Sequence, residues 1–164
     1  MNTTSRNRIL VIEDDPHISE GIELNLSLQG YEVKVAQNGI DGLEDWKQWC
    51  PHLIVLDLML PGMDGMQILK NIRLEDEQLP ILILSAKGDP ADKIEGFTDG
   101  VDDYMTKPFN LDEFLLRIGR LLKRNQWKQE QSDSFSTGST ATPSVNPSIL
   151  SAGSPFAERI RMGN

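Results

Sequence analysis

The chain has 164 residues and a formal net charge of −9, from 25 acidic and 16 basic side chains. This acidity argues against direct nucleic-acid binding, because phosphate contacts need clustered Lys and Arg. The single cysteine, Cys50, excludes a disulfide within the chain, and no apolar run approaches the roughly 20 residues of a membrane span. The composition is typical of a cytoplasmic protein with one domain and no membrane contact.

Segments that are apolar or strictly alternating predict five strands, at 9–12, 31–35, 53–58, 81–84 and 101–105. Between and after them, apolar residues that recur every three or four positions predict helices around 18–26, 40–46, 68–72, 89–98 and 111–122. Asn110 is the expected N-cap of the last helix. Apolar strands joined by helices indicate an α/β fold with a doubly wound, five-stranded parallel sheet, flavodoxin-like in its order 2-1-3-4-5, and helices on both faces.

The composition changes near residue 124. All of the excess negative charge lies in residues 1–124, and residues 132–155 are mainly Ser, Thr, Pro and Gly. Such a segment buries too little apolar surface to offset the entropy lost on ordering. We therefore expect a domain over 1–124 and a flexible linker over 125–164.

Acidic residues lie at the ends of two predicted strands. Glu13, Asp14 and Asp15 follow the first strand, and Asp57 ends the third. In this sheet order the carboxyl ends of those strands are neighbours at the switch point, where doubly wound sheets bind ligands. Carboxylates this close need a cation, and hard oxygen ligands suit Mg²⁺. The alternative is a solvated loop or a helix cap, but Asp57 interrupts an apolar strand and favours a functional role.

Ser85 and Lys107 follow the fourth and fifth predicted strands. Alone, a serine there is usually a cap and a lysine is usually solvated. Together with the carboxylates they would line one cleft with a hydroxyl, an amine, a metal and an acceptor carboxylate. These are the groups that phosphoryl transfer uses.

Four segments, 11–16, 55–65, 84–87 and 100–109, together resemble the receiver domain of bacterial two-component response regulators, over residues 7–124. The resemblance implies that Asp57 accepts a phosphoryl group from a phosphohistidine of a sensor histidine kinase or a histidine phosphotransfer protein. It also implies a regulatory domain that catalyses only its own phosphorylation and dephosphorylation.

The resemblance further implies a metal site. Asp14, Asp57 and the backbone carbonyl of Met59 would bind Mg²⁺ directly, with Mn²⁺ as a substitute. Glu13 would contact the ion through water, and Asp15 would cap the first helix.

In the same family a lysine pairs with the acyl phosphate, and here that residue is Lys107, before a cis peptide bond to Pro108. Ser85 and Tyr104 would form the switch pair. After phosphorylation Ser85 would turn toward a phosphate oxygen, and Tyr104 would move inward.

Residues 102–109 resemble most closely those regulators that carry a winged-helix DNA-binding output domain, the OmpR/PhoB class. Such receivers form homodimers on phosphorylation through the fourth helix, the fifth strand and the fifth helix. The matching charge pairs are Lys93 with Glu113, Asp103 with Arg117, and Asp102 with Arg124. The alternative is that these are ordinary exposed charges, each of which contributes little.

The sequence contains no output domain, so we expect a longer regulator in which that domain follows the linker and alone contacts DNA. One alternative is a single-domain receiver that acts as a phosphorelay shuttle or binds a partner protein. Another is a metal-dependent hydrolase of the dehalogenase type, which would need a second Asp where this chain has Met59.

Overall fold

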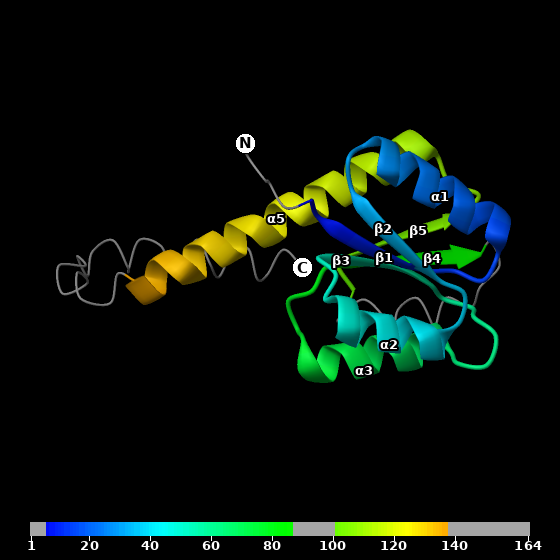
Figure 1. Cartoon of the computed structure of the whole chain (residues 1–164), viewed down its shortest axis with the longest axis horizontal. Helices are drawn as coiled ribbons and strands as arrows, with labels where there is room; N and C mark the ends of the chain where they lie inside the picture. Colours follow the sequence, from blue (N-terminus) through cyan, green and yellow to red (C-terminus); the bar gives the residue numbers. More distant parts are fainter. Residues whose placement is uncertain (1–5, 87–100, 138–164) are drawn as a thin grey trace, which may run out of the picture. The chain divides into compact units, whose positions relative to one another are not determined.

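The computed structural model describes residues 6–86 and 101–137 of the chain (Figure 1). The strands are β1 (Arg8–Ile12), β2 (Glu32–Ala36), β3 (Leu53–Asp57), β4 (Ile81–Ala86) and β5 (Asp103–Lys107). The helices are α1 (Pro16–Leu28), α2 (Gly39–Trp49), α3 (Gly65–Glu75) and α5 (Leu111–Thr137). The helix predicted over 89–98 lies outside the described residues. In the part of the chain that is described, no helix has the length and apolar character that crossing a membrane requires.

The five strands form one parallel sheet in the order β2-β1-β3-β4-β5, which confirms the predicted fold. Strand β3 occupies the centre, and all five of its residues are buried. Because β1 and β3 are neighbours, with Ile12 opposite Leu56, their carboxyl ends finish side by side at one edge of the sheet. This places the residues after β1 next to Asp57.

The chain divides into two compact units, Met1–Gln126 and Trp127–Asn164. In the first unit, apolar side chains pack on both faces of the sheet. Helices α2 and α3 cover one face, and α1 with the first turns of α5 covers the other (Figure 1). Successive residues of β1 alternate between the two layers, so Leu10 and Ile12 join the first core cluster and Ile9 and Val11 the second.

Strand β5 begins two residues later than the sequence predicts. Just before the strand, Asp102 accepts the backbone N–H of Ile81 with its Oδ2 at 2.9 Å, and its own N–H donates to the carbonyl oxygen of Ile81 at 3.2 Å. The ladder starts with Asp103 opposite Leu82 and continues to Lys107 opposite Ala86. Lys107 thus lies at the same edge of the sheet as Asp57.

Helix α5 runs to Thr137, so residues 125–137 are helical where the composition predicts the start of a flexible linker. Between Gly119 and Gly138 the sequence has neither Gly nor Pro, the residues that oppose helix formation most strongly. The remainder of the predicted linker, residues 138–164, lies outside the described residues. The N-terminal end of α5 is as expected, since the Asn110 side chain accepts the N–H of Glu113 at 3.0 Å.

Candidate functional site

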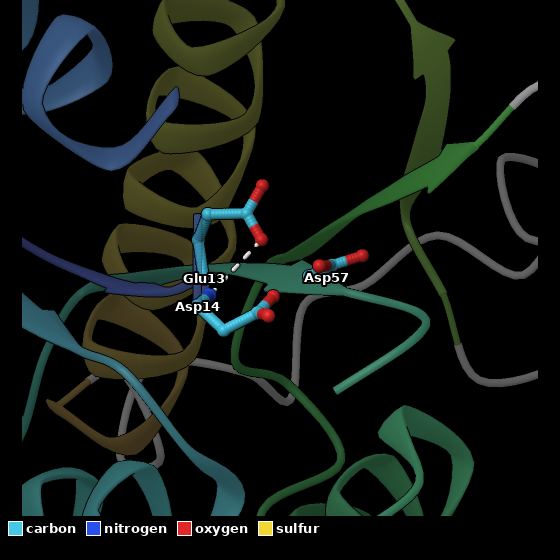
Figure 2. A group of neighbouring side chains, drawn as sticks. All are labelled: Glu13, Asp14 and Asp57. Carbon is cyan, nitrogen blue, oxygen red and sulfur yellow. Dashed lines mark hydrogen bonds between the residues drawn. The ribbon is translucent and has the colours of Figure 1, made fainter. Parts of the chain in front are cut away.

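Three carboxylates meet at the carboxyl edge of the sheet. Glu13 and Asp14 follow β1 and Asp57 ends β3, and one oxygen from each lies within 4.8 Å of the others (Figure 2). The side chain of Glu13 is fully buried and Asp57 is 4% exposed, while Asp14 faces solvent. Carboxylates held this far from water are costly unless a cation compensates them.

Lys107 provides part of that compensation. Its Nζ lies 2.6 Å from Oε1 of Glu13 and 3.3 Å from Oδ2 of Asp57. The next peptide bond, between Lys107 and Pro108, is cis. One positive charge against three carboxylates leaves the cluster with an excess of negative charge.

The pKa of Glu13 reflects its burial and its acidic neighbour. Its burial, and then its contact with Asp57, raise the pKa of Glu13 to about 8, although Lys107 acts in the opposite direction. Burial alone would lower the pKa of Lys107, but its hydrogen bond with Glu13 and the charge of Asp57 outweigh burial and raise it. The cluster therefore favours any added cation, and its hard oxygen donors are those that Mg²⁺ prefers.

Backbone groups orient the carboxylates. The N–H of Met59 donates to Oδ1 of Asp57 at 3.2 Å. The N–H of Asp14 donates to Oε2 of Glu13 at 3.1 Å (Figure 2). Asp15 has a different role, because its Oδ1 accepts the N–H of His17 at 2.9 Å and caps α1. The predicted capping by Asp15 is thus confirmed.

Ser85 and Tyr104 lie on the neighbouring strands β4 and β5. Ser85 is buried, and its Oγ donates to the carbonyl oxygen of Met105 at 3.4 Å. Tyr104 is 49% exposed. In this structure the hydroxyl of Ser85 is thus hydrogen-bonded to β5, and the side chain of Tyr104 lies on the surface.

Two of the charge pairs that the sequence suggests for a dimer form ion pairs within one chain. Arg117 contacts both oxygens of Asp103, at 2.6 and 2.7 Å, and also Oε1 of Glu113 at 2.7 Å. Nη2 of Arg124 lies 3.0 Å from Oδ1 of Asp102. The remaining predicted partner, Lys93, lies outside the described residues.

Asp102 also binds a residue that the sequence pattern does not indicate. Nη2 of Arg73, near the end of α3, lies 3.1 Å from Oδ2 of Asp102, the oxygen that accepts the N–H of Ile81. Arg73 further donates to the carbonyl oxygen of Leu79 at 2.8 Å. Asp102 therefore joins α3, β4 and α5.

Replacing Asp102 with Ala should destabilise the isolated chain. The change removes the acceptor of the partly buried Ile81 N–H and the carboxylate that pairs with Arg73, and we expect a loss of about 1–3 kcal/mol in the free energy of unfolding. Urea denaturation measures this loss of stability, and Glu23→Ala on the exposed surface of α1 serves as the control. Equal stabilities for the two variants would show that the Asp102 contacts contribute nothing to folding.

The comparisons with known proteins agree with this geometry. The sequence pattern of the response regulator receiver domain matches residues 9–119, and the chain belongs to this family. The DNA-binding dual master transcriptional regulator RpaA of Synechocystis is 46% identical over 119 residues, which are 71% of this chain and 49% of that protein. The transcriptional regulatory protein YkoG of Bacillus subtilis is 37% identical over 132 residues, 80% of this chain and 58% of that protein. The chain thus spans about half the length of the curated relatives it matches.

Solved structures show the same likeness. The receiver domain of the Francisella response regulator 1452 is 37% identical with a TM-score of 0.67, over 73% of this chain and 98% of that one. A response regulator from Chloroflexus aurantiacus is 36% identical with a TM-score of 0.67, over 73% of this chain and 99% of that one. The fold and the family are therefore those of receiver domains.

Proposed function

We propose that Asp57 of this receiver accepts a phosphoryl group from a phosphohistidine on a sensor histidine kinase or a histidine phosphotransfer protein. The observation that carries the proposal is the position of Asp57, a nearly buried carboxylate at the end of the central strand, beside two further acids and Lys107. A structural role alone does not account for such a carboxylate in an apolar strand.

We infer that the acidic cluster binds Mg²⁺, or Mn²⁺ in its place. Asp14, Asp57 and the carbonyl oxygen of Met59 would be direct ligands, and Glu13 would hold a bound water. The excess negative charge of three clustered carboxylates supports this assignment. When bound, the ion would neutralise oxygens of the incoming phosphoryl group.

The residues of the chain itself would carry the transfer. A carboxylate oxygen of Asp57 attacks phosphorus while the bond to the donor nitrogen breaks. With the other ring nitrogen of the phosphohistidine protonated, this leaves an acyl phosphate on Asp57 and a neutral imidazole on the donor. The Met59 N–H already holds Oδ1 of Asp57, and Lys107 lies 3.3 Å from Oδ2, within reach of a phosphate oxygen. The chain acts as a regulated acceptor, with no other substrate.

The output would begin with Ser85 and Tyr104. Ser85 would exchange its bond to the carbonyl oxygen of Met105 for one to the phosphate, and the exposed ring of Tyr104 would move inward. This would change the surface that β5 and the first turns of α5 form. By analogy with the transcriptional regulators it resembles, we propose that this surface then dimerises and controls a DNA-binding output domain in a longer protein.

Activation with beryllium fluoride should raise dimer affinity about 5- to 150-fold, the range of a coupling of 1–3 kcal/mol. In the proposed dimer Arg117 would exchange its bond to Asp103 of the same chain for one to Asp103 of the second chain. Arg117→Glu should therefore dimerise poorly, because it places like charges at that contact, and adding Asp103→Arg should partly restore the dimer. Because exposed charge pairs are screened, the dimer should weaken as salt rises.

Analytical ultracentrifugation of the wild type and the two variants, with and without beryllium fluoride, measures these differences. The predicted interface is wrong if the activated wild type stays monomeric at high concentration, or if Arg117→Glu dimerises equally well. A phosphorylated monomer would instead favour the single-domain shuttle.

A further inference from the structure

The N-terminus of α3 lies directly against the backbone that carries Asp57. Gly65 is the first residue of α3, and its N–H donates to the carbonyl oxygen of Leu58 at 3.1 Å. A Cβ atom at Gly65 would lie 2.8 Å from the carbonyl oxygens of Asp57 and Leu58 and 3.0 Å from Cα of Leu58. Carbon atoms do not pack this close to backbone, so any side chain at Gly65 must push α3 and the β3–α3 loop apart.

This contact differs in kind from those of other glycines in the described helices. A Cβ at Gly42 would meet three atoms of the Ile12 side chain, and one at Gly21 would meet nothing within 4 Å. A side chain can rotate away, whereas the carbonyl groups next to Asp57 belong to the end of a central strand. Helix α3 is also fixed, because Asp64 and Gln67 form a capping box at its start.

The displaced atoms would be those that orient the site. Leu58 lies between Asp57 and Met59, and the Met59 N–H holds Oδ1 of Asp57 at 3.2 Å. A shift of Leu58 therefore moves the Asp57 carboxylate and the Met59 carbonyl together. These two groups are the acceptor and a metal ligand in the proposed function, on which the following inference rests.

We propose that Gly65 is a positioning residue for phosphoryl transfer. Its lack of a side chain lets the first turn of α3 pack on the backbone of Asp57 and Leu58, and this packing sets the geometry of the Asp57 carboxylate and the Met59 carbonyl oxygen. Gly65 itself contacts none of the reacting atoms.

Gly65→Ala tests the proposal against two controls. Gly21→Ala adds the same methyl group to a helix where there is space for it, and Leu26→Ala removes a fully buried side chain from α1 and lowers stability away from the acidic cluster. Mg²⁺ affinity is measured by calorimetry, and phosphorylation by acetyl phosphate is measured by intact mass, at a temperature where all proteins are folded.

We expect Gly65→Ala to weaken Mg²⁺ binding about tenfold or more and to slow phosphorylation at least as much, because a misplacement of about 1 Å can slow a reaction about 100-fold. Gly21→Ala should match the wild type, and Leu26→Ala should keep both properties despite a larger loss of thermal stability. The proposal is overturned if folded Gly65→Ala behaves as the wild type, or if Leu26→Ala shows the same losses.

Amide hydrogen exchange of the wild type provides a second readout if Gly65→Ala does not fold. Mg²⁺ should slow exchange at the Gly65 amide together with the Met59 amide, since both bonds close the same loop on Asp57. If Mg²⁺ protects the Met59 amide but leaves the exchange rate of the Gly65 amide unchanged, the positioning role is contradicted. The calorimetric titration of the wild type also tests the proposed function separately. If the wild type binds no Mg²⁺, the proposed function is contradicted before any variant is compared.

Discussion

Asp57→Asn should abolish phosphorylation by acetyl phosphate, the largest effect that we expect from any single substitution. The amide has nearly the same shape as the carboxylate and can still accept the Met59 N–H, but its oxygen is a poor nucleophile. The change also removes one negative charge from the cluster, so the variant should remain folded. Intact-mass spectrometry of protein treated with acetyl phosphate and Mg²⁺ measures the result.

Asp15→Asn is the matched control. It makes the same chemical change close to the cluster, but Asp15 caps α1, and Asn caps helices about as well as Asp. We expect one added phosphoryl group in the wild type and in Asp15→Asn, and none in Asp57→Asn. Equal addition to Asp57→Asn would place the acceptor at another residue.

Asp14→Asn should have the second large effect, on the metal. Asp14 is the exposed member of the cluster, so it contributes a carboxylate oxygen that an entering cation reaches directly. Its loss should weaken Mg²⁺ binding more than tenfold, because a small hard cation depends on the one or two carboxylates that ligate it. Phosphorylation should fall with metal binding, since the incoming anion then faces uncompensated acids.

Calorimetric Mg²⁺ titrations of the wild type, Asp14→Asn and Asp15→Asn test this expectation. Asp15→Asn removes the same charge from the neighbouring position and should bind Mg²⁺ nearly as the wild type does. If both variants show the same small decrease in Mg²⁺ affinity, Asp14 is not a metal ligand, because an equal decrease would reflect only the net charge of the region.

The position of the acidic cluster could be predicted from the sequence. Apolar strands separated by helical segments specify a parallel doubly wound sheet, and its order places β1 beside β3. Once these are neighbours, Glu13, Asp14 and Asp57 must end at the same edge. Lys107 follows from the same rule, because β5 runs parallel to the others and ends there too.

The partners of individual charged side chains could not be predicted in the same way. Asp102 and Asp103 have the pattern of interface residues, yet Arg124 and Arg117 reach them within one chain. The contact of Asp102 with Arg73 spans α3 and the start of β5 and depends on where both lie in space. Charge spacing along a helix indicates only which residues share a face.

Backbone contacts are hidden from the sequence for a similar reason. The sequence shows a glycine at position 65, but only the packed structure shows that a Cβ atom there would lie 2.8 Å from the carbonyl oxygens of Asp57 and Leu58. Likewise, the end of α5 depends on the absence of Gly and Pro up to Gly138, a signal that the polar composition of residues 125–137 obscures.

The central claim, that Asp57 is the phosphoryl acceptor, is tested most directly by locating the modified residue. Borohydride reduces an aspartyl phosphate to homoserine, so peptide mass mapping of the reduced protein identifies the acceptor. After treatment with acetyl phosphate and Mg²⁺, we predict homoserine at Asp57 and at no other acidic residue, and none when Mg²⁺ is chelated. Homoserine at Asp14 or Asp15, or an unmodified Asp57 in protein that has gained a phosphoryl group, would contradict the account.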